Sequence, residues 1–219
     1  MKRLAAVAVG ALAIVVLFPA TASARTLSQG MCGSDVHHLQ HELGLHKYLP
    51  ASYTPGCYDY RTMQAVMAYQ GWARLTRDGV AGSITQARLK KAVTPRPWTG
   101  HRHFAHVEVH KGRQVLLLIG KLGKVRRAIH VSTAAPGHVT PTGHWHVYSK
   151  SRMSWSIPFH VWLPWASYIV GGIAMHSFAS VPGYPASHGC IRMPAPEARW
   201  MYKRTPIGTP VWVHSYMAS

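Results

Sequence analysis

The chain has 219 residues, with 24 lysines and arginines against six acidic residues, and its formal net charge is +18 at pH 7. Such a basic protein is expected to meet an anionic surface, such as acidic wall polymers, membrane headgroups or nucleic acid. Beyond residue 100 the only acidic side chains are Glu108 and Glu197. So few carboxylates disfavour a glycosidase, which usually needs a facing pair, and a Ser-His-Asp enzyme, which needs one beside its histidine.

Residues 1–24 have the pattern of a secretory signal peptide. A basic start is followed by the apolar run of residues 4–20, and a small-x-small cleavage pattern ends at Ala24. We expect cleavage after Ala24 and a secreted protein of the cell wall or periplasmic-side space. An uncleaved membrane anchor is the less favoured alternative, because the run is short for a bilayer span. Export makes nucleic acid the weakest of the three partners, and no nucleic-acid module is visible.

The three cysteines divide into a close pair and a single residue. Cys32 and Cys57 each lie beside a glycine in a loop-like context, and Cys190 lies far downstream. Pairing Cys32 with Cys57 would close a loop of about 25 residues and stabilise the fold by roughly 3 kcal/mol on the chain-entropy model. Cys190 would then be an unpaired thiol in an oxidising compartment, either an inert free thiol or a reactive group.

Residues 25–93 are predicted to form a small all-α domain of three short helices. Ser34, Asp59 and Ser83 are the expected N-terminal residues or caps, and the turn at residues 77–82 separates the second helix from the third. The apolar face of the first helix is expected to consist of Val36, Leu39, Leu43 and Leu45.

Residues 94–102 are predicted to be a linker, because prolines and a glycine gather there without periodicity. A period-two pattern then indicates strands, beginning with residues 103–110, 114–120 and 125–132. The one credible helix of this half starts after Pro194, and a closing strand ends at His214. Residues 103–214 are therefore predicted to form a mainly-β domain.

The stretch "ASHGCIRM", residues 186–193, is the candidate reactive site. A free cysteine is mostly protonated at neutral pH, and a histidine within hydrogen-bond reach can take its proton. Two histidines are available. His188 is two residues before Cys190, on the same face if the stretch is extended, and His176 ends another predicted strand, from which it can approach across the site.

The glycine and the arginine of this stretch have separate expected roles. Gly189 lets a substrate carbonyl approach the backbone, so that the N–H groups of Gly189 and Cys190 can form an oxyanion hole. Arg192 can hold a carboxylate bidentately, and a structural role for it is equally open.

These residues resemble the catalytic motif of the L,D-transpeptidases, the YkuD family. The motif reads His176, ten intervening residues, then Ser187-His188-Gly189-Cys190-Ile191-Arg192. An upstream "TPTG" at residues 140–143 matches a second family element, and the resemblance covers about residues 103–214. Two features depart from the family pattern: Ser177 stands where glycine is frequent, and the short spacer indicates a trimmed lid over the site.

The resemblance implies a YkuD-like β-sandwich and a cysteine acyltransferase without metal or cofactor. Cys190 would attack a peptidoglycan tetrapeptide stem, release D-alanine and form a thioester, which an amine of another stem resolves into a 3→3 cross-link. His176 would be base and then acid, with its second ring nitrogen held by the Ser177 carbonyl. His188 would support the site, and Ser187 and Arg192 would contact substrate.

The family resemblance further implies a monomer that a β-lactam of the carbapenem type inhibits. Transfer to water instead, an L,D-carboxypeptidase reaction, is an open alternative.

Residues 25–93 resemble, in addition, the peptidoglycan-binding domain that precedes many wall enzymes. The matching pieces include Gly33-Ser34-Asp35-Val36, Tyr69-Gln70 and the run from Asp78 to Gly82. This resemblance implies peptidoglycan stem peptides and anionic wall polymers as partners. A purely structural helical cap is the alternative.

Other classes of exported protein differ from this sequence in the order of their catalytic residues or in their need for a metal. An endopeptidase of the NlpC/P60 type places cysteine before histidine, and a sortase needs a distant arginine. A non-catalytic wall-binding protein and a zinc peptidase remain alternatives, the second of which a chelator would inhibit. We expect no metal site, because alternating histidines on strands more often face solvent; the histidines concerned are His101, His103, His106, His110, His144 and His146.

Overall fold

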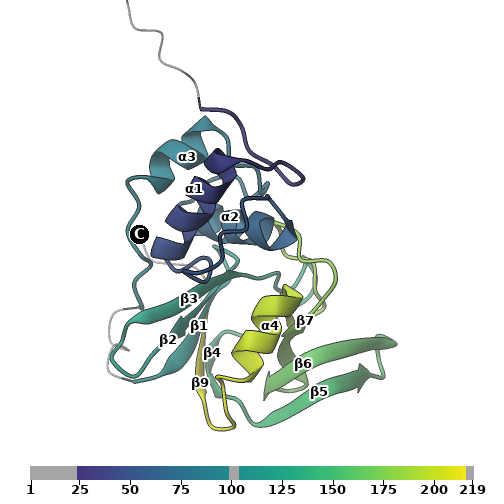
Figure 1. Cartoon of the computed structure of the whole chain (residues 1–219). Helices are drawn as coiled ribbons and strands as arrows, with labels where there is room; N and C mark the ends of the chain where they lie inside the picture. Colours follow the sequence, from purple (N-terminus) through teal and green to yellow (C-terminus); the bar gives the residue numbers. More distant parts are fainter. Residues whose placement is uncertain (1–23, 99–103, 216–219) are drawn as a thin grey trace, which may run out of the picture.

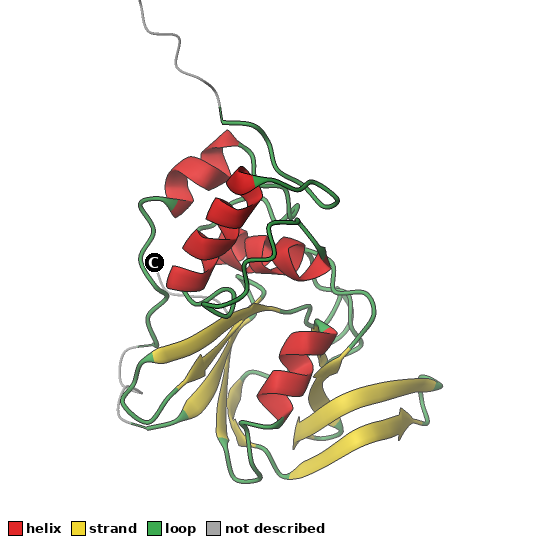
Figure 2. Ribbon diagram, viewed as in Figure 1, coloured by secondary structure: helices red, strands yellow, loops and turns green. Residues whose placement is uncertain are grey.

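The computed structural model describes residues 24–98 and 104–215. A group of three helices lies beside a mainly-β part with one further helix (Figures 1 and 2), so the predicted fold class is confirmed. The expected signal peptide, up to residue 23, and the histidines at 101 and 103 lie outside the described residues. Within them, no helix has the length and hydropathy that crossing a bilayer requires.

The N-terminal part consists of α1 (Ser34–Leu45), α2 (Tyr60–Trp72) and α3 (Ser83–Leu89). Asp59 caps α2 as predicted, since its carboxylate accepts the Thr62 N–H. Two expectations for α1 are wrong. Its N-cap is Gly33, with Ser34 already inside the helix. Leu45 is 50% exposed instead of buried, because it ends the helix on the side away from the packed face.

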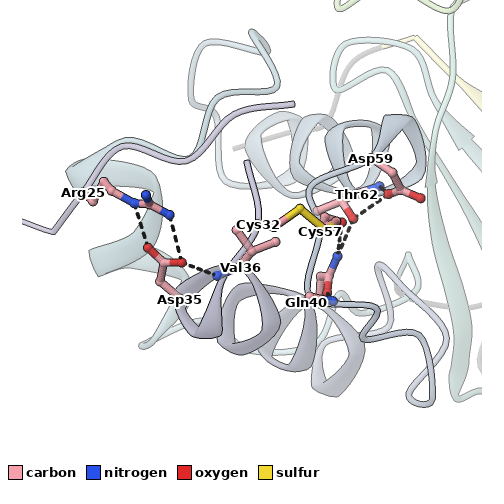
Figure 3. Close-up of a disulfide and its surroundings, with 9 residues drawn as sticks. Arg25, Cys32, Asp35, Val36, Gln40, Cys57, Asp59 and Thr62 are labelled. Carbon is pink, nitrogen blue, oxygen red and sulfur yellow. Dashed lines mark hydrogen bonds and ion pairs between the residues drawn. A yellow bond between two sulfur atoms is a disulfide. The ribbon is translucent and has the colours of Figure 1, made fainter. Parts of the chain in front are cut away.

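A disulfide between Cys32 and Cys57 fastens α1 to the segment that leads into α2 (Figure 3). The bridge spans 25 residues. Beside it, the buried Gln40 side chain donates to the Cys57 carbonyl and to Thr62 Oγ1, both at 2.9 Å. The polar network and the covalent link together fix the angle between α1 and α2.

The mainly-β part contains two sheets. The five-stranded sheet has the order β3-β2-β1-β9-β4 and the four-stranded sheet the order β5-β6-β7-β8. The strands are β1 (His106–His110), β2 (Val115–Ile119), β3 (Val125–His130), β4 (Gly143–His146), β5 (Ser149–Ser156), β6 (Val161–Val170), β7 (Ile173–Ser177), β8 (Ile191–Met193) and β9 (Pro210–His214). The helix α4 (Ala195–Tyr202) begins directly after Pro194, as predicted.

The central core lies between the two sheets and under α4 (Figure 2). From the large sheet it takes side chains such as Val109, Leu116 and Val211, and from the small sheet Met175 and Ile191. Short and β-branched side chains on alternate positions allow the two layers to pack closely. The strands β7 and β8 are thereby held at a fixed place against the large sheet.

A second core joins the helices to the outer face of the large sheet. Side chains from all three helices form one buried cluster with Val115, Leu117 and Ile119 of β2, while Leu116 and Leu118 of the same strand point into the central core. β2 is therefore buried on both faces. The helical part is packed onto the sheet rather than held only by the segment that follows it.

The segment after α3 is also docked. The backbone N–H of Trp98 donates to both carboxylate oxygens of Glu108 at 3.0 Å, and the Trp98 ring stacks on the His214 ring. His106 and His110 flank the same carboxylate, each with Nε2 at 3.0 Å from an oxygen. The expectation that these two histidines face solvent is wrong: both are buried, because Glu108 between them supplies a partner. His144 and His146 are exposed.

Candidate active site

Parallel pairing of β7 and β8 brings the two parts of the motif together. His176 on β7 is in register with Arg192 on β8, and Cys190 stands two residues before Arg192, at the start of the strand. The Ala174 N–H, two residues before His176, donates to Cys190 Sγ at 3.5 Å. His176 and Cys190, which are fourteen positions apart in the sequence, are thus brought to neighbouring segments of one short parallel pair.

A cavity of about 690 Å³ opens at this place. Its walls include all of the side chains with proposed chemistry: His176, Ser187, His188, Cys190 and Arg192. The remaining wall is mainly aromatic and aliphatic, with Trp155 and Phe159 from the β5–β6 hairpin and Tyr168 from β6. The volume is within the range of ligand sites, which are likewise mostly apolar with a few polar groups.

His176 is held as a neutral imidazole. Its Nδ1 lies 2.7 Å from the Ser177 carbonyl oxygen, which fixes Nδ1 as the protonated nitrogen and leaves Nε2 with a lone pair. Burial lowers the pKa of His176 to about 4, and the nearby Arg192 charge acts in the same direction, while the Ser177 carbonyl opposes both. The ring is therefore unprotonated at neutral pH.

Cys190 is the free cysteine of the described residues. Burial raises the pKa of its thiol, and the Ala174 N–H and the Arg192 guanidinium offset this in part, because both favour the thiolate. At neutral pH the cavity is thus lined by a neutral thiol and a neutral imidazole. A thiolate would have to form by transfer of the proton during attack.

The turn before Cys190 is closed by Ser187. The Ser187 hydroxyl donates to the Cys190 carbonyl at 2.6 Å and accepts the Gly189 N–H at 3.1 Å. The side chain expected to contact substrate is therefore engaged within the turn, and so is one of the two N–H groups expected in an oxyanion hole. Among the described residues, the Cys190 N–H has no such partner.

Gly189 is required by the shape of this turn. Its φ is +140°, which L-residues rarely adopt, and a Cβ there would lie 2.6 Å from Ile173 Cδ1 and 3.0 Å from the Val139 carbonyl oxygen. Thr140 of the "TPTG" element donates to the Gly189 carbonyl at 2.7 Å. Sequence reasoning did not give Thr140 a role, although the element that contains it was visible.

Arg192 and His188 both line the cavity, and each packs on an aromatic ring. The Arg192 guanidinium lies 4.1 Å above the Phe178 ring and forms no ion pair with a described carboxylate. The His188 ring stacks on Phe159, at 4.5 Å between centroids, and meets His138 edge-on. His188 therefore contacts the tip of the β5–β6 hairpin, whose residues line part of the cavity. The sequence alone did not align this hairpin with a lid.

Neither downstream carboxylate reaches the cavity. Glu108 lies in the histidine cluster already described, and Glu197 on α4 pairs with Arg61 and Arg127 at 2.5 and 3.2 Å. No group of histidines, cysteines and carboxylates within residues 24–98 and 104–215 has the arrangement of a metal site. A thiol and an unprotonated imidazole in one cavity are groups that acyl transfer by a cysteine with a histidine base would require.

Comparison with known proteins agrees with this geometry. Residues 105–213 match the model of the YkuD family, the L,D-transpeptidase catalytic domain, and residues 32–89 match a peptidoglycan binding domain. No match was found among curated proteins.

Two solved structures extend the likeness over most of the chain. An L,D-transpeptidase from Xylanimonas cellulosilytica is 33% identical, with a TM-score of 0.77, and the match covers 87% of this chain and 98% of that one. An L,D-transpeptidase from Stackebrandtia nassauensis is 23% identical with a TM-score of 0.54, over 87% and 95% of the two chains, and shows the shared fold. On this identity and coverage, the chain belongs to the L,D-transpeptidases of the YkuD family and carries a peptidoglycan-binding domain before its catalytic domain.

Proposed function

We propose that this transpeptidase is an exported enzyme that uses Cys190 as nucleophile on peptidoglycan tetrapeptide stems. The observation that carries the proposal is that Cys190 and His176 line the same cavity, with the imidazole lone pair left available. The separation of both downstream carboxylates from that cavity supports a thiol mechanism over a carboxylate one.

The chemistry starts from the neutral pair. As Cys190 Sγ attacks the carbonyl carbon of the third stem residue, its proton passes to His176 Nε2. The bond to the terminal D-alanine then breaks, and the imidazolium returns the proton to the leaving amine. The resulting thioester is resolved by a side-chain amine of a second stem, which gives a 3→3 cross-link, or by water, which gives the carboxypeptidase product. His176 removes the proton of the incoming group in that second half.

The oxyanion that forms on the stem carbonyl needs a donor close to Cys190 Sγ. The Cys190 N–H is the group we assign to it, because the Gly189 N–H is engaged by Ser187. Arg192 is free to bind a stem carboxylate, and its charge also stabilises the thiolate. Ser187 contributes by holding the turn rather than by contacting substrate.

The helical domain and the charge of the chain fit an enzyme that works in the wall. We propose that residues 25–93 hold the enzyme on peptidoglycan and that the excess of basic over acidic residues favours anionic wall polymers. Export follows from the signal pattern of residues 1–24, and the disulfide of the helical part fits an oxidising compartment.

The test combines substrate turnover with trapping of the acyl-enzyme. Mature protein is incubated with disaccharide-tetrapeptides, and the products are read by mass spectrometry: a dimer that has lost one D-alanine supports transfer, and release of D-alanine without a dimer supports carboxypeptidase action. In parallel, a carbapenem should add once to the wild type, at Cys190, and not at all to Cys190→Ser. An equal adduct on Cys190→Ser would refute the assignment of the nucleophile.

A further inference from the structure

The segment between His176 and Ser187 is held in place by side chains from outside it. This catalytic loop, residues 178–186, contains no helix or strand. Four successive carbonyls from Val181 to Tyr184 each accept a hydrogen bond from a side chain elsewhere in the protein. Such a pattern is unusual for a surface loop, whose carbonyls mostly face water.

Two of these four donors belong to the helical domain. Gln64 of α2 donates from Nε2 to the Val181 carbonyl at 3.1 Å, and Arg77, which follows α2, donates from Nε to the Gly183 carbonyl at 2.5 Å. The other two come from the large sheet and its continuation: His130 Nε2 lies 2.9 Å from the Pro182 carbonyl, and Ser132 Oγ donates to the Tyr184 carbonyl at 2.8 Å.

The contact between the helical domain and the catalytic loop is tight at the level of the backbone. A Cβ added to Gly183 would lie 2.0 Å from the Arg77 carbonyl oxygen. Only glycine therefore fits at this position without moving one of the two segments. Val181 is buried, and the Gln64 side chain that holds it is 4% exposed. The interface is closely packed at Gln64, Val181 and Gly183, and a shift of the loop there would break these contacts.

The loop leads directly into the reactive turn. Its last residue, Ala186, and Ser187 both donate their N–H groups to the Thr133 carbonyl, and the Ser187 hydroxyl then holds the Cys190 carbonyl. A displacement of the loop at Val181 or Gly183 would be transmitted over a few bonds to the turn that carries Cys190. A displacement of about 1 Å between reacting groups can lower a rate on the order of 100-fold.

We propose that Gln64 and Arg77 are positioning residues for the acyl transfer, so that the helical domain is a structural part of the active site as well as a wall-binding module. The proposal rests on the proposed role of Cys190. In this arrangement the helical domain sets the position of the Ser187–Cys190 turn relative to His176 on β7, which is anchored separately in the central core.

The test compares two buried glutamines of the same domain. Gln64→Met keeps the volume of the side chain and removes the donor to the loop. Gln40→Met is the matched control, because Gln40 is equally buried but bonds only within the helical domain, at Gly56, Cys57 and Thr62. Arg77→Lys is a second variant that keeps the charge and changes the donor geometry. For each protein we measure the melting temperature, the rate of carbapenem acylation at saturation, and hydrogen exchange of residues 179–184.

We expect the saturated acylation rate of Gln64→Met to fall by at least about tenfold, with faster exchange in the loop and little change in the carbapenem concentration for half-saturation. Gln40→Met should lose as much melting temperature or more and acylate at the wild-type rate. The proposal would be overturned if Gln64→Met acylated and exchanged at the wild-type rates. It would also be overturned if Gln40→Met lost as much acylation rate as Gln64→Met. If the wild type itself forms no adduct at Cys190, the proposed function fails, and the exchange measurement still decides whether Gln64 holds the loop.

Discussion

The pH at which the acylation rate falls on the acid side tests directly whether His176 is unprotonated. The structure holds the ring with Nε2 unprotonated, and burial lowers its pKa to about 4. If neutral His176 is the base that takes the Cys190 proton, the acylation rate is proportional to the unprotonated fraction. At pH 5.5 a group of pKa 4 is about 97% unprotonated, whereas an ordinary histidine of pKa 6.5 is only about 9% unprotonated. The two cases differ about tenfold in rate at that pH.

The assay is the rate of carbapenem acylation between pH 4 and 8, read from loss of the β-lactam absorbance and from the mass of the adduct. Near-ultraviolet circular dichroism at each pH reports that the fold is intact. We expect a flat profile down to about pH 5 and a fall toward pH 4. Arg192→Gln should move the acid fall of the acylation rate to higher pH, because the Arg192 charge lowers the pKa of His176. Arg192→Lys, which keeps the charge, should return that fall to its wild-type pH. A midpoint near 6.5 in the wild type would refute the neutral-base reasoning.

Two further predictions concern stability and the reactive turn. The buried His130 and His176 both have pKa values lowered to about 4, so the unfolded chain binds protons that the folded chain does not. Stability should therefore decrease as pH falls from about 6.5 to 4.5, by roughly 2 to 3 kcal/mol for each histidine; urea midpoints that do not move over this range would contradict it. Gly189→Ala should reduce acylation by about 100-fold or more, because its Cβ would overlap Ile173 and its φ is +140°. Gly208→Ala, also at positive φ but with open space around it and not among the residues that line the cavity, is the control, and comparable losses in both would show that strain alone is responsible.

The reactive residues could be predicted from the sequence because their chemistry is concentrated in a short motif. The stretch around Cys190 and the preceding His176 fix the residue types, whereas the parallel pairing of β7 with β8 that brings them together is visible only in the structure. The roles of Ser187 and the Gly189 N–H could not be read in the same way. They depend on the φ of one glycine and on hydrogen bonds inside a turn, which a residue list does not contain.

The packing of the two parts against each other was also beyond local patterns. His106 and His110 read as solvent-facing on an alternating strand, but Glu108 and the docked Trp98 cover them. One signal was present in β2, whose five residues "VLLLI" are all apolar. A strand without alternation is typical of burial on both faces, and here the helices supply the second cover.

The double burial of β2 has a consequence for how the chain folds during synthesis. The helical segment emerges from the ribosome first, yet part of its core consists of Val115, Leu117 and Ile119, which follow only after α3 and the docked segment are complete. Until β2 arrives, the helices hold an unfilled apolar face, and a fragment reduced to the catalytic residues 105–213 would present the matching row of β2 to water. Exposed apolar strands of this kind associate readily with other chains. The smallest piece of this enzyme that folds by itself is therefore expected to start before α1 and end after β9.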